Sequence, residues 1–254
     1  MILDSFKLDG KAALVTGAGQ GLGQGMALAL AGAGADVAGL DRGPSAATGE
    51  AVRALGRRYR EVVCDLRTAS VADLNAVVAG VVRDLGRLDI LVNNAGIIRR
   101  APAVDFSEAD WDDVLQIDLK AAFFLAQAAA RVMIPQGSGK IINTASMLSF
   151  QGGVIVPSYT AAKSGVAGLT RALANEWAPH HIIVNAIAPG YMATDNTAAL
   201  RADPKRSVAI LDRIPADRWG TPDDLKGAAV FLASEAAGYV TGAVLNIDGG
   251  WLAR

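Results

Sequence analysis

The feature that most constrains the fold of this chain is an alternation of short apolar runs with longer helical patterns, which starts near the first residue. The short runs are mostly continuous and do not alternate apolar with polar residues, which is typical of strands buried on both faces of a parallel sheet. Helices are then expected between successive strands as right-handed crossovers that cover both faces. The expected strands are residues 12–16, 36–40, 61–64, 90–93, 140–143, 182–187 and 244–247.

The same pattern sets the expected helices and the number of domains. With 254 residues, 52% of them hydrophobic, the chain is long enough for one large core, and no linker, repeat or low-complexity tract divides it. We therefore expect an α/β fold, a single-domain Rossmann-type doubly wound parallel sheet of about seven strands with helices on both faces. A long irregular stretch from Gly190 onward predicts a small substrate lid around residues 190–215. The expected helices are residues 22–33, 45–55, 71–84, 108–130, 158–177 and 222–234.

Composition and charge argue against several classes of function. The net charge is −1, and the charged residues are scattered through the sequence. The sequence therefore shows no basic face of the kind that binds nucleic acid. The chain starts without a basic and then apolar leader, and its most apolar helical run is interrupted by Gln127 and Arg131, which predicts a cytoplasmic protein without a membrane segment. One cysteine, Cys64, and two adjacent histidines, His180 and His181, provide neither metal-ligand spacing nor the histidine set of a hydrolase.

A glycine-rich turn follows the first expected strand. It reads Thr16-Gly17-Ala-Gly19-Gln-Gly21-Leu-Gly23, and a helix is expected to begin at once. Glycines allow the backbone to approach a pyrophosphate, and the start of a helix supplies free N–H groups and a positive dipole. Glycine turns without a nucleotide do occur, but a strand before and a helix after this one are the context of a dinucleotide fingerprint.

Asp41, at the end of the second expected strand, indicates which dinucleotide is bound. A carboxylate at this distance from the glycine turn accepts hydrogen bonds from the adenosine ribose and repels a 2′-phosphate. Arg42 could hold that phosphate, but Gln20 in the turn is uncharged and adds no second cation. The sequence therefore favours NAD over NADP, while a simple turn or helix cap is the other interpretation of Asp41.

Tyr159 and Lys163 form a pair with a chemical use. On a helix they are i and i+4, so both side chains lie on one face. A free phenol has a pKa near about 10, and a neighbouring cation lowers it, so the tyrosine could exchange protons with a substrate. Such pairs are common on solvated helices. The motif becomes informative only together with the polar groups and glycines that follow the expected strands.

Several further motifs follow successive expected strands in a fixed order. Each lies at the C-terminal end of its strand, where ligands bind in open α/β sheets. The chain resembles the short-chain dehydrogenase/reductase family over essentially its whole length. The matching pieces are the glycine turn, Asn93-Asn94-Ala95-Gly96, Ser146, Tyr159 with Lys163, and Pro189-Gly190 with Thr194.

The resemblance implies direct hydride transfer between a substrate carbon and a nicotinamide, with Tyr159 as the acid/base. It also implies that Ser146 orients the substrate carbonyl and that Lys163 binds the nicotinamide ribose. Asp65 is expected to contact adenine, and Asn93 to support the cofactor and the central strand. No metal is expected. The implied cofactor contacts are Gly17, Gln20, Gly21, Leu22, Gly23, Asp41, Asp65, Leu66, Asn93, Ala95, Gly96, Tyr159, Lys163, Pro189, Gly190, Met192 and Thr194.

One position departs from the family pattern. The family usually has asparagine in the helix after Asn-Asn-Ala-Gly, within a proton relay behind the lysine, and here Asp118 stands in its place. Aspartate keeps an acceptor oxygen but loses the amide donor and adds a charge. We expect an active enzyme in which Asp118 shifts Lys163 and the pH optimum.

Three residues are candidates for substrate binding besides Ser146 and Tyr159. Arg99 and Arg100 follow Asn93-Asn-Ala-Gly closely and suit a carboxylate, although two solvated arginines are an equal alternative. Gln151 could meet a sugar hydroxyl or be an ordinary loop residue. Further stretches resemble family members that act on deoxy-keto sugar acids, which implies such a substrate. These stretches are 97–100, 147–153, 175–177, 188–194, 214–220 and 248–254.

Other functions and assemblies stay open from the sequence. A 3-oxoacyl-carrier-protein reductase or another polyol dehydrogenase would share every catalytic motif, and a nucleotide-sensing protein could keep the fold without the chemistry. The family usually forms homotetramers through two long helices, here expected at 108–130 and 158–177, although a buried helix within the chain has a similar composition. The ending 251–254 could reach a neighbouring subunit or fray.

Overall fold

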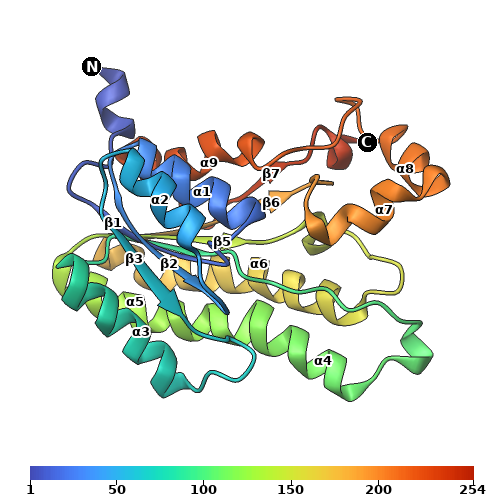
Figure 1. Ribbon diagram of the computed structural model, residues 1–254, viewed down its shortest axis with the longest axis horizontal. Helices are drawn as coiled ribbons and strands as arrows, with labels where there is room; N and C mark the ends of the chain where they lie inside the picture. Colours follow the sequence, from blue (N-terminus) through green and yellow to red (C-terminus); the bar gives the residue numbers. More distant parts are fainter.

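The structure, a computed structural model, describes residues 1–254. Seven parallel strands form one sheet in the order β3-β2-β1-β4-β5-β6-β7 (Figure 1). The order reverses between β1 and β4, so the C-terminal ends of these two strands flank the cleft in which open α/β sheets bind ligands. The strands are β1 Ala12–Thr16, β2 Asp36–Asp41, β3 Tyr59–Val63, β4 Ile90–Asn93, β5 Gly139–Thr144, β6 Ile182–Pro189 and β7 Val244–Ile247.

Two layers of helices cover the sheet, as Figure 1 shows. In β1, successive side chains point to opposite faces, so Leu14 belongs to the core on one side and Val15 to the core on the other. No helix combines the length and apolar composition needed to cross a membrane. One layer contains α1 Gly21–Gly32, α2 Ala46–Ala54 and α9 Asp223–Ala233, and the other contains α3 Val71–Leu85, α4 Glu108–Leu115, α5 Ala121–Gln136 and α6 Pro157–Trp177.

The predicted fold class is confirmed, and most predicted boundaries are within two residues of the observed ones. The largest difference is the helix predicted at 108–130. It is broken into α4 and α5 by a π-helical turn, η3 Gln116–Lys120, and it runs six residues further, to Gln136. It ends at Gly137, whose φ of +70° is a conformation that glycine adopts readily.

Residues 190 to about 203 were predicted to be irregular, within a lid predicted at about 190–215, but the structure contains helices there. After β6 come a 3₁₀ turn, η6 Asp195–Thr197, and two short helices, α7 Ala198–Ala202 and α8 Pro204–Leu211. The side chain of Asp203 accepts the N–H groups of Lys205 and Arg206, which caps α8. An Asp-Pro start signal for this helix was therefore present in the sequence.

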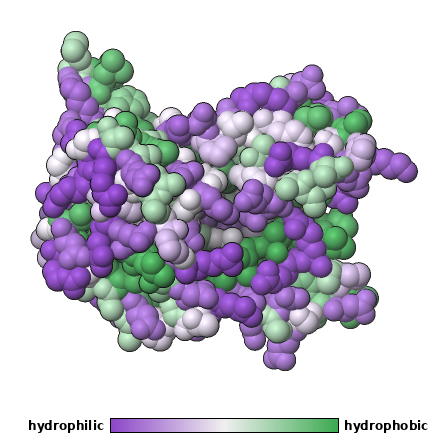
Figure 2. Space-filling view, viewed as in Figure 1, coloured by the Kyte–Doolittle hydropathy of each residue, from purple (hydrophilic) through white to green (hydrophobic).

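Both chain ends lie at the rim of the molecule (Figure 1). The N-terminal turn, η1 Ile2–Phe6, projects outward and carries hydrophobic surface at its tip (Figure 2), where Met1, Ile2 and Leu3 are exposed. The C-terminal turn, η8 Trp251–Ala253, lies instead beside α8. It belongs to a small apolar cluster, separate from the two main cores, that contains Met147, Ile210, Ile214 and Trp251.

Candidate active site

The glycine turn between β1 and α1 leaves no room for side chains. Gly17 has a φ of +66° and Gly21 a φ of +59°. A Cβ on Gly17 would lie 2.9 Å from the side-chain nitrogen of Asn94, and one on Gly23 would overlap the Gly17 carbonyl. The start of α1 at Gln20 has no side-chain cap, so its first N–H groups are available to a ligand. The turn therefore fits a dinucleotide pyrophosphate.

Two polar residues that the sequence analysis did not single out hold this turn in place. The Thr16 hydroxyl accepts the backbone N–H groups of Asn94 and Ala95, each at 2.9 Å. The Asn94 side chain donates to the Thr16 carbonyl at 3.0 Å. These hydrogen bonds join the ends of β1 and β4, where the strand order reverses. The signal in the sequence that could have indicated the two residues is their polarity at the ends of adjacent strands.

Asp41 lies beside the glycine turn, as the sequence predicts. Its Oδ2 atom accepts the N–H of Gly19 at 2.9 Å, and its Oδ1 atom accepts the N–H of Arg42 at 2.8 Å. A Cβ on Gly19 would lie 2.8 Å from the carboxylate. The structure thus fixes a negative charge at the end of β2, whereas the side chain of Arg42 is exposed.

The predicted residues after β3 and β4 occupy different environments. Asp65 is exposed at the end of β3, and Leu66 beside it is buried. Asn93 is also buried, and its side-chain nitrogen donates to the Ala122 carbonyl and to Asn143 Oδ1, both at 3.0 Å. Asn93 therefore fastens β4 to α5 and β5, which is a supporting position, and Asn143 is a partner that sequence reasoning missed.

Tyr159 and Lys163 lie on one face of α6, as their spacing predicts. The Lys163 nitrogen is 5.4 Å from the centre of the Tyr159 ring and donates to the Thr144 carbonyl at 2.9 Å. Ser146 is buried directly after β5, and its hydroxyl accepts the N–H of Leu148 at 3.1 Å. The three side chains thus come from the ends of neighbouring elements at one edge of the sheet.

Asp118 lies in the π-helical turn η3, behind the lysine. Its Oδ2 atom is 3.3 Å from the Lys163 nitrogen, and its Oδ1 atom accepts the N–H of Ile97 at 2.8 Å. Both side chains of this ion pair are almost fully buried. A Cβ on Gly96 would lie 2.8 Å from the Asp118 carboxylate, so the glycine of the Asn-Asn-Ala-Gly motif makes room for the pair.

The charges of Asp118 and Lys163 act on each other's pKa and on that of Tyr159. Burial raises the pKa of Tyr159, and Asp118 raises it further, while Lys163, Ser146 and Arg100 oppose the change without reversing it. Burial disfavours the ammonium of Lys163, but Asp118 and Tyr159 outweigh this effect and raise the lysine pKa. Burial also raises the pKa of Asp118 against the attraction of Lys163 and the hydrogen bond from Ile97. Lys163 alone therefore does not bring the tyrosine pKa down to neutrality.

The site residues predicted after β6 lie in a segment that faces the glycine turn. A Cβ on Gly21 would lie 3.8 Å from the methyl group of Thr194, so the two segments face each other. Gly190 packs against the backbone of Asp248, where a Cβ would collide with it. Pro189 and Met192 are buried. The position of Thr194 agrees with a contact to the far end of a dinucleotide held by the turn.

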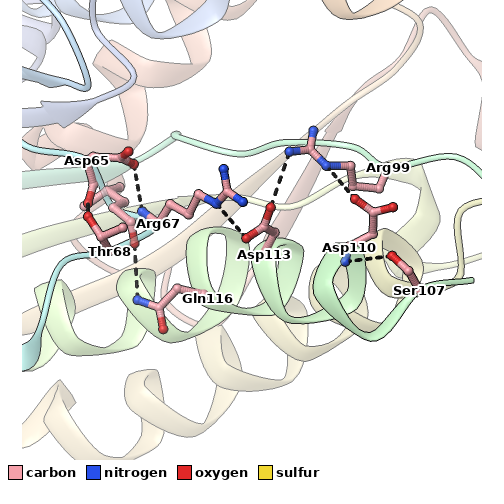
Figure 3. Close-up of polar contacts among 9 residues, drawn as sticks. Asp65, Arg67, Thr68, Arg99, Ser107, Asp110, Asp113 and Gln116 are labelled. Atoms are coloured by element: carbon pink, nitrogen blue, oxygen red, sulfur yellow. Dashed lines mark hydrogen bonds and ion pairs between the residues drawn. The ribbon is translucent and has the colours of Figure 1, made fainter.

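The structure separates the two candidate arginines. The Nε atom of Arg99 is 3.0 Å from Asp110 and its Nη2 atom is 3.4 Å from Asp113, so its guanidinium is bound by α4 (Figure 3). Arg100 instead donates to the carbonyl of Asn196 in the predicted lid at 3.3 Å, and its charge acts on Tyr159. Arg100 is therefore near the reactive group, and Arg99 is already paired.

Gln151 contacts the end of the chain and the predicted lid. Its side-chain oxygen accepts from Trp251 Nε1 at 3.3 Å and from Arg213 at 3.4 Å. The Arg213 guanidinium lies 4.1 Å from the Trp251 ring centre, and the Tyr191 ring is 4.7 Å from the same tryptophan. Residues 251–254 thus pack on this chain's own lid, which differs from both expectations for them. Trp251 and Arg213 were missed because their contacts join distant parts of the sequence.

Known proteins are similar to this chain in sequence and in fold. A family model described as enoyl-(acyl carrier protein) reductase matches residues 17–252. The chain belongs to the short-chain dehydrogenase/reductase family. Two curated relatives, both named 2-dehydro-3-deoxy-D-gluconate 5-dehydrogenase, come from Escherichia coli strain K12 and Dickeya dadantii strain 3937. They are 60% and 58% identical to this chain, and each alignment covers 100% of both chains.

A solved structure of another family member supports the same assignment. The Agrobacterium tumefaciens protein, provisionally named a 2-deoxy-D-gluconate 3-dehydrogenase and solved with bound NADP, is 55% identical. It matches with a TM-score of 0.91 over 99% of this chain and 100% of its own. This short-chain dehydrogenase/reductase is therefore an oxidoreductase that acts on CH–OH groups and uses a nicotinamide cofactor.

Proposed function

We propose that this enzyme oxidises, and in reverse reduces, a secondary alcohol of a deoxy sugar acid of the 2-dehydro-3-deoxy-D-gluconate type. The names of the relatives support this substrate class. The observation that carries the proposal is the group of Ser146, Tyr159 and Lys163 beside an arginine, Arg100, whose guanidinium reaches the predicted lid. An arginine in this place suits the carboxylate of a sugar acid.

In the proposed mechanism each side chain has one task. The bound dinucleotide supplies the hydride acceptor or donor. Tyr159 takes the proton of the substrate hydroxyl during oxidation and returns it during reduction. Lys163, held by the Thr144 carbonyl, stabilises the phenolate, and Ser146 orients the substrate oxygen. Asp118 positions Lys163 and the loop at Ile97.

We propose NAD as the preferred cofactor, with the adenosine ribose against Asp41 and the adenine near Asp65 and Leu66. The carboxylate of Asp41 is fixed by two backbone N–H groups next to the glycine turn, where it disfavours an added phosphate. The Agrobacterium relative was solved with NADP, so the preference of this chain needs a direct comparison of both dinucleotides.

We also propose a homotetramer and a cytoplasmic location, where free dinucleotide and sugar acids are both available. Strand β7 is an edge strand with Leu245 and Asn246 exposed, which offers a surface for pairing with a second subunit. Helix α6 exposes small residues, including Ser164 and Gly168, that would let a second helix approach closely.

The test is an assay of sugar acids, neutral polyols and oxoacyl thioesters with NAD and NADP in both directions. We expect the highest kcat/KM on a deoxy sugar acid with NAD. Tyr159→Phe should lower kcat by about 100-fold or more, because it removes the acid/base but not the ring. Comparable activity of Tyr159→Phe and wild type would refute the assigned chemistry, and a preference for oxoacyl thioesters would refute the substrate class.

The role of Arg100 has its own test. Arg100→Ala should lower kcat/KM on the sugar acid by about 10-fold or more and on a neutral polyol much less, since only the acid loses a charge partner while both substrates depend on the pKa of Tyr159. Arg99→Ala is the matched comparison, because its guanidinium is held by Asp110 and Asp113. Equal losses on acid and neutral substrates in the Arg100→Ala enzyme would exclude carboxylate binding by this side chain.

A further inference from the structure

One carboxylate on α4 is shared by two arginines from different loops of the site. Asp113 Oδ1 is 2.7 Å from Arg67 Nε, and Asp113 Oδ2 is 3.4 Å from Arg99 Nη2. Figure 3 shows Asp113 between the two guanidinium groups, with Arg67 on the side of Asp65 and Arg99 on the side of Asp110. The carboxylate is 15% exposed, so water competes for it only in part.

The Arg67 loop belongs to the side of the site where we propose that adenine binds. The backbone N–H of Arg67 donates to Asp65 Oδ1 at 2.9 Å. Gln116, three residues after Asp113 and on the same face of the helix, donates to the carbonyls of Leu66 and Ala69 at 3.2 and 3.3 Å. The end of α4 and the start of η3 therefore hold this loop by both side-chain and backbone contacts.

The Arg99 loop belongs to the substrate side. Arg99 is bound by Asp113 and also by Asp110, one helical turn earlier on the same face. The next residue, Arg100, leaves the loop in a different direction and reaches Asn196 in the lid. Fixing Arg99 on α4 thus fixes the place from which Arg100 extends toward a substrate.

We propose that Asp113 is a positioning residue that couples cofactor binding to sugar-acid binding. A dinucleotide that orders the loop of Arg67 also orders α4 and, through Asp113, the loop of Arg99. The second ligand then meets a loop that is already ordered, which gives positive cooperativity in both directions. For two partly exposed ion pairs we expect a coupling of about 3- to 10-fold in affinity. This inference rests on the proposed function.

The test measures binding without turnover. NADH is the reduced form of the cofactor, and 2-dehydro-3-deoxy-D-gluconate carries the alcohol that the proposed reaction oxidises. The two can therefore occupy the site together without hydride transfer between them. The dissociation constant of NADH is measured by its fluorescence with and without a saturating amount of this sugar acid. In the wild type we expect the acid to tighten NADH binding by about 3- to 10-fold. In Asp113→Asn the ratio should fall clearly below the wild-type value, while the contacts of Gln116 and Asp110 with the two loops remain.

Two variants make this result specific. Asp112→Asn changes the neighbouring residue, whose side chain is exposed and unpaired, and it should keep the wild-type ratio. Arg67→Gln removes only the ion pair on the cofactor side and should lower the ratio as Asp113→Asn does, which covers the case in which the aspartate variant misfolds. Equal ratios in Asp113→Asn and Asp112→Asn would overturn the inference, as would a wild-type ratio of one in an enzyme that oxidises the sugar acid. A wild type that does not oxidise it with NAD would instead refute the proposed function.

Discussion

At the scale of single residues, Asp118 is the position where this enzyme differs from the usual family pattern. Asparagine there would keep an oxygen for the N–H of Ile97 but would carry no charge. The carboxylate instead neutralises Lys163 across 3.3 Å and raises the pKa of the nearby Tyr159. The charge on this one side chain therefore controls how readily the tyrosine gives up its proton.

Asp118→Asn should move the pH profile in a predictable direction. Oxidation requires the phenolate of Tyr159, so kcat/KM rises with pH through the tyrosine pKa. Removing the negative charge lowers that pKa, and the rise should shift to lower pH. The measurement is the pH dependence of kcat/KM for oxidation, with Asp112→Asn as the control. A profile that does not move, or that moves to higher pH, contradicts this role of Asp118.

Asp41→Ser should change cofactor selectivity. The substitution removes the charge that would repel a 2′-phosphate and leaves the exposed Arg42 able to approach it. We expect the ratio of kcat/KM for NADP to that for NAD to rise on the order of 10-fold or more. Steady-state kinetics with both dinucleotides measure this ratio. An unchanged ratio would mean that other groups decide the selectivity.

At the scale of elements, the C-terminal turn packs against the predicted lid. The guanidinium of Arg254 donates to the carbonyls of Asp212 and Arg213 at 2.7 and 3.2 Å, at the end of α8. Trp251 fills the space between Ile210, Ile214 and the loop after β5. The lid is therefore held by a cluster of its own, outside the two cores that stabilise the sheet.

Trp251→Ala should loosen this cluster and leave the rest of the fold intact. Truncating a buried tryptophan costs about 3–5 kcal/mol, which here falls on the lid. We expect KM for the sugar acid to rise about 10-fold and limited proteolysis to cut within residues 198–213. Tyr239→Ala, which removes a fully exposed ring, should do neither. Resistance of the Trp251→Ala protein to the protease would show that the tail does not hold the lid.

The sequence predicted the helices and strands far better than the contacts between them. The glycine turn and Asp41 could be predicted because each lies next to a strand end, and the Tyr159/Lys163 pair because its spacing matches one turn of a helix. The contacts of Arg99 and Gln151 could not, because they depend on how α4 and the chain end pack in space. The π-helical turn at Asp118 was missed for a related reason, since its sequence has an ordinary helical pattern.

At the scale of the whole molecule, the proposed tetramer can be tested on the exposed face of α6. Gly168 is exposed on this helix among other small residues, and a long side chain there would keep a partner helix away. We expect light scattering to give four times the chain mass for the wild type and a smaller assembly for Gly168→Arg. Arg171→Ala, on the same helix, should stay tetrameric. A monomeric wild type would refute the assembly.

The packing of the C-terminal turn against α8 also decides where the protein tolerates additions. The guanidinium of Arg254 is bound to the end of α8, so a peptide fused after this residue would start against the substrate lid. The N-terminal turn projects from the opposite end of the same side of the molecule, and its first residues are exposed (Figure 1). Affinity tags and fusion partners therefore belong at the N-terminus, where they do not contact the substrate lid.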